Sequence, residues 1–292
     1  MSNYLIFRTD RIGDFLITLI LIKSIIENNK NANITVIASE KNYTYIKNCK
    51  FINNIYLLKD NIFNRLLLIF KLRKYFYKSI IIHDNKKRSK FISHFLKSNQ
   101  LINIDKIKEY PHIDIIKYIL KELNLTFNTS SLNILDDKRK NDHLRKGIVL
   151  HFDEKWMHNT YIQKYTNIQP TENELILFIK SLIEKNDEQL KITTGINTPQ
   201  ILKAVLKSFK ENELKIFENL NFLELEKIIL NSDLLISCHG ALSHIAAAIN
   251  IKQIDIIDKS YNYSRWTKHF RNYNYIYRDS FKNLSKEILR LI

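Results

Sequence analysis

Short apolar segments with the length of buried strands alternate along this chain with longer segments of helical periodicity. In the first half, the predicted strands are residues 4–7, 34–37, 55–58 and 79–82. The predicted helices between and after them are residues 14–28, 42–48, 62–75, 89–97 and 111–123. Strands that alternate with helices favour a parallel sheet covered on both faces, so the pattern predicts an α/β fold.

The alternation stops at a polar stretch and then begins again. Residues 128–146 are rich in Asp, Asn, Lys and Arg, and Gly147 follows them. The predicted strands after this stretch are residues 148–152, 190–193, 215–217, 234–237 and 253–257, and the predicted helices are residues 171–185, 199–209, 222–231, 243–250 and 281–292.

Two α/β halves joined by one polar linker predict two domains with a ligand cleft between them. We expect the domains to span residues 1–135 and 146–280. The last helix, residues 281–292, is expected to pack back on the first domain.

Glycine occurs only four times in 292 residues, and three of the four follow predicted strands. These three are Gly13, Gly195 and Gly240. A glycine at such a place lets the backbone turn sharply and approach a ligand, while the next helix offers unpaired N–H groups to an anion. The three loops are therefore the predicted working surface of the chain.

The loop after the first strand, Arg8-Thr9-Asp10-Arg11-Ile12-Gly13-Asp14, concentrates charged side chains. Asp14 has two open interpretations: a cap of the following helix, or a partly desolvated carboxylate that accepts a proton from a hydroxyl nucleophile. Asp10 could simply pair with Arg8 or Arg11.

The loop before the alanine-rich helix reads Cys238-His239-Gly240-Ala241-Leu242-Ser243-His244. Its backbone amides could cradle a phosphate at the helix N-terminus, with the two histidines as further donors. A buried structural role for His244 is the alternative.

Two further charged loops follow strands. Lys155, in Asp153-Glu154-Lys155-Trp156, could reach a phosphate in the same cleft, or it could be solvated while Trp156 packs at the domain edge. Lys86, Lys87 and Arg88, close after His83, form a basic run that is either a solvated face or a surface for an anionic acceptor.

The net charge of +16 and the pI near 9.6 favour anionic partners, among them nucleic acid, phosphorylated sugars and anionic lipids. Cys49 and Cys238 are far apart and form no metal or redox motif, which favours a reducing, cytoplasmic setting. We expect no signal peptide, and the apolar stretch 15–22 is too short to span a bilayer.

Several common motifs are absent from the sequence. It contains no G-x-G-x-x-G, no P-loop, no G-x-S-x-G and no His/Cys spacing for zinc. No nucleic-acid recognition module stands out either. We therefore expect no cofactor, no metal and no nucleic-acid partner.

Several segments resemble the family 9 glycosyltransferases, which include the heptosyltransferases of lipopolysaccharide assembly. Residues 5–14 are similar to the family's opening strand and Gly-Asp loop, and residues 234–248 to its Asp-Thr-Gly-Leu-Ser-His signature with an alanine-rich helix. Lys155-Trp156 is similar to the loop that opens the second domain, and residues 111–125 to a His-led helix.

The resemblance implies a GT-B fold, in which two Rossmann-like domains bind the acceptor and a nucleotide-sugar donor without a metal. It implies that Asp14 is the general base of an inverting transfer. The implied donor-site residues are Lys155, Thr194, Gly195, His239, Gly240, Ala241, Leu242, Ser243 and His244. The implied acceptor-site residues are Arg8, Asp10, Arg11, Gly13, His83, Lys86, Lys87 and Arg88.

The implied partners are a nucleotide sugar, ADP-heptose or another one, and an anionic glycolipid acceptor. We expect the protein at the inner face of the cytoplasmic membrane, held by its basic N-terminal half without insertion. The signature departs from the family at its start, where His239-Gly240-Ala241 stands for Asp-Thr-Gly. A scaffold that binds nucleic acid and a two-domain nucleotide-sugar epimerase are the alternative functions.

Overall fold

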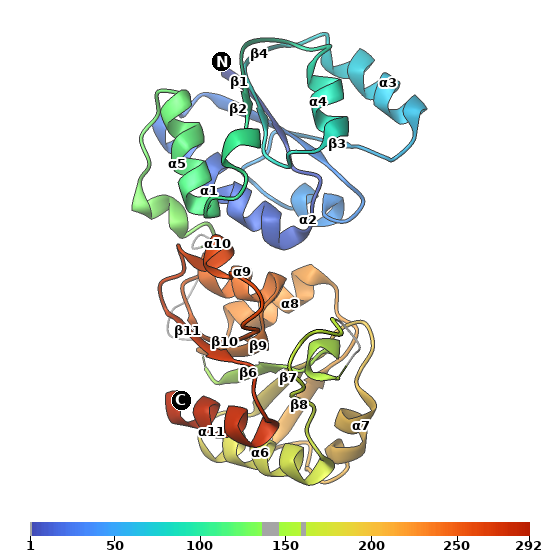
Figure 1. The fold of residues 1–292 in the computed structure, drawn as a ribbon, viewed down its shortest axis with the longest axis vertical. Helices are drawn as coiled ribbons and strands as arrows, with labels where there is room; N and C mark the ends of the chain where they lie inside the picture. Colours follow the sequence, from blue (N-terminus) through green and yellow to red (C-terminus); the bar gives the residue numbers. More distant parts are fainter. Residues whose placement is uncertain (1, 136–145, 159–161) are drawn as a thin grey trace. The chain divides into compact units, whose positions relative to one another are not determined.

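The computed structural model describes residues 2–135, 146–158 and 162–292, and it divides into two compact units (Figure 1). Unit 1 comprises Met1–Ile134 with Ser264–His269, and unit 2 comprises Leu135–Tyr263 with Phe270–Ile292. Most of the expected linker, residues 136–145, lies outside the described residues. The change from unit 1 to unit 2 thus falls one residue from the expected boundary at residue 135.

Unit 1 is built on a sheet of parallel strands. They are β1 (Ser2–Phe7), β2 (Ala32–Ala38), β3 (Asn54–Leu57), β4 (Phe76–Ile82) and β5 (Lys97–Asn103). Their order in the sheet is β3-β2-β1-β4-β5, so the direction of strand succession reverses between β1 and β4. Leu5 of β1 pairs with Thr35 on one side and with Ile80 on the other. Central parallel strands are covered on both faces, which explains their continuous apolar runs.

The helices of unit 1 are α1 (Ile12–Asn28), α2 (Tyr43–Lys47), α3 (Ile62–Leu72), α4 (Lys87–Ser93), α5 (His112–Glu122) and α10 (Ser264–Thr267), with short 3-10 turns at Asp105–Ile107 and Thr129–Leu132. Helix α1 packs on α5, and α3 packs beside α4 (Figure 1). The inner faces of α3 and α4 share one apolar cluster with β1 and β4, which is the core on that side of the sheet.

Unit 2 has a second parallel sheet. Its strands are β6 (Ile148–His151), β7 (Leu190–Thr193), β8 (Leu214–Phe217), β9 (Leu234–Cys238), β10 (Lys252–Ile257) and β11 (Tyr273–Tyr277). Their order is β11-β10-β9-β6-β7-β8, so the succession reverses between β6 and β9. Both sheets therefore have the doubly wound order of Rossmann folds, with the first strand of each unit beside the fourth.

The helices of unit 2 are α6 (Glu172–Glu184), α7 (Gln200–Leu206), α8 (Phe222–Leu230), α9 (Ala241–Ala248) and α11 (Phe281–Leu291), with a 3-10 turn at Glu154–Trp156. Helix α6 begins at a capping box, in which the Thr171 hydroxyl accepts from the Glu174 amide and the Glu174 carboxylate accepts from the Thr171 amide. The core of this unit lies around Trp156, Phe178 and the central strands.

The last helix, α11, belongs to unit 2. It packs on α6 and β11, and Phe281, Leu284 and Ile288 are buried in the unit 2 core. The expected packing of this helix on the first domain stays a prediction. The segment Ser264–His269 joins unit 1, which the sequence pattern did not predict.

None of the helices in the described ranges is both long and apolar enough to cross a bilayer.

The packing of α11 predicts a large loss of stability in Phe281→Ala. Phe281 is 4% exposed, and its ring lies 6.3 Å from that of Trp156 and 5.6 Å from that of Phe178. Removing such a ring is expected to lower the free energy of unfolding of unit 2 by about 3–5 kcal/mol, measured by urea denaturation.

The matched control is Leu177→Ala on α6, where Leu177 is 65% exposed. Its effect is expected to stay below about 0.5 kcal/mol. Similar losses in both variants would contradict the packing of α11 on the unit 2 core.

Candidate functional site

Most of the predicted loops lie at the carboxyl ends of the strands where each sheet reverses its strand order, while the Gly195 loop follows β7, which neighbours β6. In unit 1, Arg8 follows β1 and His83 follows the neighbouring strand β4. In unit 2, Phe152 follows β6 and His239 follows the neighbouring strand β9. Ligands of open α/β sheets bind at such switch points. The expected cleft between the two domains stays a prediction.

Arg8 is the centre of the unit 1 loops. Its guanidinium is 2% exposed and donates hydrogen bonds to the His83 carbonyl at 2.6 Å and to the Asp14 carbonyl at 3.0 Å. Nη1 also lies 3.4 Å from a carboxylate oxygen of Asp10, and Nη2 lies 3.7 Å from one of Asp14. Asp10 thus pairs with Arg8, which is one of the two partners that the sequence left open, and Arg8 positions both carboxylates from within the protein.

Asp14 does not occupy the N-cap position that one interpretation gave it. The N-cap of α1 is Arg11, and Asp14 stands three residues later, where its Oδ2 accepts a hydrogen bond from the Arg11 amide at 3.2 Å. Its carboxylate still stabilises the helix start, and its side chain remains 27% exposed. A capping role and access to a substrate are therefore compatible.

The basic run after β4 is divided among different partners. Lys86 forms an ion pair with Asp10, Nζ to Oδ1 2.5 Å, and donates to the Thr9 carbonyl at 3.1 Å. Arg88 binds Asp60, while Lys87 is exposed at the start of α4. The three cations thus do not form one patch, and Lys86 belongs with the Arg8 loop.

A pair of buried histidines lies beneath this loop. His83 Nδ1 is 3.0 Å from the Thr18 hydroxyl, while its Nε2 and the Nδ1 of His112 have no hydrogen-bond partner among the described residues. Burial, the charge on Arg8 and the nearby His112 hold the pKa of His83 well below its usual value. Burial first, and then Arg8 and Arg265, lower the pKa of His112 to about 3.

In unit 2, Lys155 meets Gly240 at the start of α9. A Cβ atom at Gly240 would lie 2.7 Å from Lys155 Nζ. The ammonium also lies 3.1 Å from Asp153 Oδ2, and His151 Nε2 lies 3.3 Å from the same oxygen. Burial alone would raise the pKa of Asp153, but Lys155 and His151 outweigh it and hold this pKa well below its usual value. The fold thus places Lys155 next to Gly240, and both are predicted donor-site residues.

The reason for glycine differs from the predicted one. Of the four glycines only Gly147, which enters β6, has a positive φ, of 85°. Gly240 is extended at φ −179°, a conformation open to any residue. Its lack of a side chain makes room for Lys155, and Gly195 likewise makes room for Glu154, whose Oε2 would lie 2.6 Å from an added Cβ.

His239 is held by a carboxylate from the neighbouring strand. Its Nδ1 lies 2.6 Å from Asp255 Oδ2, and Asp255 is fully buried on β10. Ser243 donates to the other Asp255 oxygen at 2.8 Å and accepts from the Gly240 amide at 3.2 Å. The hydroxyl of Ser243 is thus engaged inside the loop, whereas the imidazole of His239 is kept in place at the helix start.

The other predicted donor-site residues have more varied positions. Thr194 is buried after β7, where its hydroxyl bonds the Gly195 carbonyl. Ala241 and Leu242 open α9, where helix geometry provides no acceptor for the first amides. His244 is 7% exposed, and its ring lies 5.7 Å from that of His239 and 5.3 Å from that of Phe270. Its buried position agrees with the structural alternative.

Sequence reasoning missed several residues of these networks, among them His112, Asp153, Asp255 and Arg278. Asp255 had a recognisable signal, because it is an acid between two isoleucines in the predicted strand 253–257. Arg278 directly follows β11 and donates to the Lys155 carbonyl at 2.7 Å and the Thr166 carbonyl at 3.0 Å. No local pattern marked its partners, which are more than a hundred residues away.

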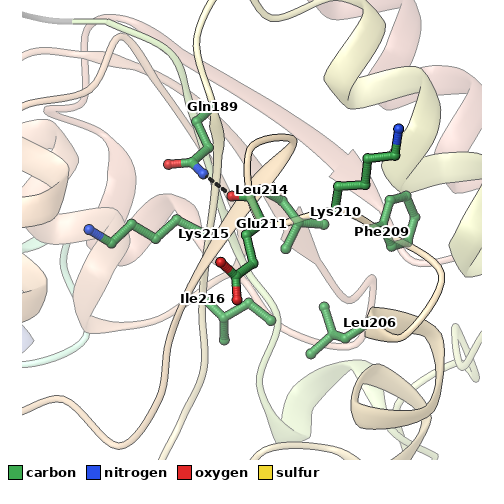
Figure 2. A pocket seen from close by; sticks show the side chains of 8 residues that line it. All are labelled: Gln189, Leu206, Phe209, Lys210, Glu211, Leu214, Lys215 and Ile216. Atoms are coloured by element: carbon green, nitrogen blue, oxygen red, sulfur yellow. Dashed lines mark hydrogen bonds between the residues drawn. The ribbon is translucent and has the colours of Figure 1, made fainter.

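A pocket in unit 2 lies elsewhere and does not coincide with these loops. Figure 2 shows it around Gln189, Phe209, Glu211 and Ile216, near the beginnings of β7 and β8. The amide of Gln189 donates to the Glu211 carbonyl at one side of it. The pocket therefore lies at the amino ends of the strands, whereas Lys155 and Gly240 lie beyond the carboxyl ends. Within the described ranges, no group of three or more His, Cys, Asp and Glu side chains is placed to hold a metal ion.

No protein-family model and no curated sequence matches this chain. Solved structures do resemble it over its whole length. The heptosyltransferase WaaC of E. coli, in a structure with ADP, has a TM-score of 0.75 at 11% identity over 100% of both chains. The E. coli ADP-heptose lipopolysaccharide heptosyltransferase II has a TM-score of 0.67 at 14% identity, over 99% of this chain and 97% of that one.

The chain therefore has the GT-B fold. A glycosyltransferase of family 9 from Veillonella parvula gives the same result, with a TM-score of 0.69 at 9% identity over 99% of this chain and 91% of that chain. The UDP-GlcNAc 2-epimerase of Methanocaldococcus jannaschii shares the fold less closely, with a TM-score of 0.57 at 13% identity over 100% and 92% of the two chains. The predicted fold class is confirmed.

The buried, neutral His112 predicts a loss of stability in acid. Its pKa of about 3 in the folded state lies below the unfolded value of 6.5, so the unfolded chain binds the proton first as the pH falls. Its contribution is present above pH 6.5 and is lost as the pH falls from 6.5 toward 3.

We expect His112→Gln to reduce the pH dependence of the free energy of unfolding by up to about 1.4 kcal/mol for each pH unit between pH 6.5 and 3. Urea denaturation at a series of pH values measures it, with His94→Gln in the same unit as the control. Parallel pH profiles for the wild-type chain and His112→Gln would contradict a neutral, desolvated His112.

Proposed function

We propose that this chain is an inverting glycosyltransferase that moves a sugar from a nucleotide-diphosphate donor to an anionic surface glycan. The observation that carries the proposal is the contact of the Lys155 ammonium with Gly240 at the start of α9. In a full-length GT-B fold, this contact stands at the switch point of the second sheet, where a diphosphate would be recognised.

The donor diphosphate would bind to Lys155 and to the first amides of α9. Both features attract negative charge, since the ammonium is a cation and the N-terminus of a helix carries partial positive charge. His239, held by Asp255, would add a donor to the phosphate oxygens. ADP and an ADP-heptose analogue are bound by the similar WaaC structures, and ADP-heptose or a related nucleotide sugar is the donor that we propose.

Asp14 would act as the general base. Its carboxylate takes the proton from an acceptor hydroxyl, whose oxygen forms a bond to the anomeric carbon from the side opposite the diphosphate. The bond between that carbon and the diphosphate oxygen breaks, its electron pair leaves with the diphosphate, and the configuration inverts. Arg8 and the Arg11 amide hold the Asp14 carboxylate in one orientation, which favours proton transfer.

Stabilisation of the departing diphosphate would supply much of the rate, because charge develops there in the transition state. Lys155 and the α9 amides are the groups suited to this, and the proposal uses no metal ion. On the acceptor side, Lys87 is the exposed cation of the basic run, whereas Lys86 and Arg88 are engaged by acids. The proposed acceptor is an anionic glycolipid of the lipopolysaccharide type at the inner face of the cytoplasmic membrane.

A nucleotide-sugar epimerase is the second candidate, because such an enzyme shares the fold at a lower TM-score. The products distinguish the two functions. A transferase releases nucleoside diphosphate and extends a glycan, whereas an epimerase leaves the sugar on its nucleotide.

Asp14→Asn is expected to lower the rate of sugar transfer by about a hundredfold to ten-thousandfold, because the amide cannot accept the proton. Asn retains an oxygen that can accept from the Arg11 amide, so the start of α1 and donor affinity should change little. Transfer is measured as release of nucleoside diphosphate in the presence of acceptor.

The control for this variant is Asp60→Asn, which removes an exposed carboxylate of unit 1 that binds Arg88. Its transfer rate should stay close to that of the wild-type chain. An active Asp14→Asn enzyme, or one that no longer binds donor, would contradict the role proposed for Asp14.

Lys155→Met is expected to weaken binding of the donor nucleoside diphosphate by about tenfold or more, because a charge-assisted contact is lost. Gly240→Ala should weaken it as well, since the new methyl group displaces Lys155 Nζ while the extended backbone accepts alanine. Thermal shift with ADP, UDP, GDP and CDP measures the binding and identifies the base.

Lys180→Met, an exposed lysine of α6, is the control and should leave the shift unchanged. If none of the four nucleotides raises the melting temperature of the wild-type chain, or if Lys155→Met behaves like Lys180→Met, the proposed donor site is wrong.

A further inference from the structure

The outer face of α3 is apolar although it is exposed. Ile62, Phe63, Leu66, Leu67 and Phe70 are each at least 43% exposed, and Phe63 reaches 80%. Their spacing of one, three and four residues puts them on one side of the helix. The opposite side packs into the core of unit 1, so α3 presents apolar side chains both inward and outward.

Helix α4, which packs beside α3, continues this character (Figure 1). Phe91 of α4 and Phe95 just after it are 43% and 51% exposed, and their rings contact each other edge to face at 5.2 Å. So many large exposed apolar side chains on two adjacent helices indicate an interaction surface.

The charge around these helices is mainly positive, although Lys90 of α4 is paired with Asp105, which is 47% exposed. Residues 61–97 contain ten Lys and Arg but a single acid, Asp84. Asp84 is buried and accepts from the hydroxyls of Thr9 and Ser89. Asp60, just before the segment, binds Arg88, and the Arg73 guanidinium lies 5.0 Å from the ring centroid of Phe70.

We propose that the α3–α4 face docks on an anionic lipid bilayer. This face is defined by Ile62, Phe63, Leu66, Leu67, Phe70, Phe91 and Phe95. The apolar side chains would enter the boundary between headgroups and acyl chains, and the surrounding Lys and Arg would bind lipid phosphates. The sequence predicts membrane contact without insertion. The proposal differs in that the apolar side chains of this face insert into the bilayer.

The positive charge and the apolar side chains of the α3–α4 face together favour an anionic bilayer as its partner. A second copy of the chain would bring two positively charged surfaces against each other, which is unfavourable. A nucleic acid would neutralise the cations but would leave Phe63 and Phe70 in water. An anionic bilayer satisfies both features.

The inference extends the membrane contact included in the proposed function, and its test measures lipid binding without any transfer reaction, so the two can fail separately. The full chain is sedimented with vesicles of phosphatidylcholine alone and of phosphatidylcholine mixed with phosphatidylglycerol. We expect binding to the mixed vesicles, and we expect Phe63→Ser combined with Phe70→Ser to lower the partition coefficient by about tenfold or more.

The matched control combines Leu177→Ser with Ile196→Ser, two unit 2 residues that are 65% and 84% exposed. This control should bind vesicles like the wild-type chain. Lys71→Gln combined with Lys74→Gln should lower binding to the mixed vesicles several-fold and should make it less sensitive to salt.

A Phe63→Trp variant reports insertion directly, through a blue shift of the added indole fluorescence when mixed vesicles are present. Equal partition of the Phe63/Phe70 variant and the wild-type chain, or an unshifted emission of Phe63→Trp in the presence of mixed vesicles, would overturn the proposal. Self-association that disappears in the Phe63/Phe70 variant while vesicle binding persists would assign the face to a second copy and would overturn it equally.

Discussion

The parallel pairing of β1 with β4, and of β6 with β9, joins two strands whose following connections leave the sheet in opposite directions. Because parallel crossovers are right-handed, the helices after the two strands of each pair cover opposite faces of the sheet. Their first turns therefore diverge, and the strand ends between them stay open to a ligand. Arg8 with Asp14, and Lys155 with Gly240, are functional candidates because this pairing places them there.

Buried charge networks hold the loops at both switch points. Asp255 has no exposed side-chain surface, yet His239, Ser243 and the Tyr273 hydroxyl all bind its carboxylate. Arg8 has the equivalent place in unit 1, where it binds backbone carbonyls and lies near two carboxylates. Burial of a charge costs several kcal/mol unless its partners are in position, so each network favours one arrangement of its loop. Such fixed arrangements suit catalysis, in which groups must be aligned before the reaction.

The parts of the fold that the sequence pattern missed share a physical reason. Strand β5 is mostly polar and β11 carries alternating half-exposed tyrosines, because each is an edge strand with less burial than the centre of a sheet. Neither strand therefore shows the continuous apolar run that identified the central strands. The short helix α10 was not predicted either, because a helix of only one turn has no periodicity to detect.

The sequence by itself determined the α/β class, the division into two halves and the loops at the carboxyl ends of the strands, because strand and helix periodicities are local properties. Tertiary structure alone decided which charges meet: Lys86 binds Asp10, Arg88 binds Asp60, and His239 binds Asp255. It also decided that Gly240 provides space for Lys155 and not a backbone turn, and that α11 packs in unit 2. Such contacts follow from the order of strands in the sheet, which local patterns along the chain do not contain.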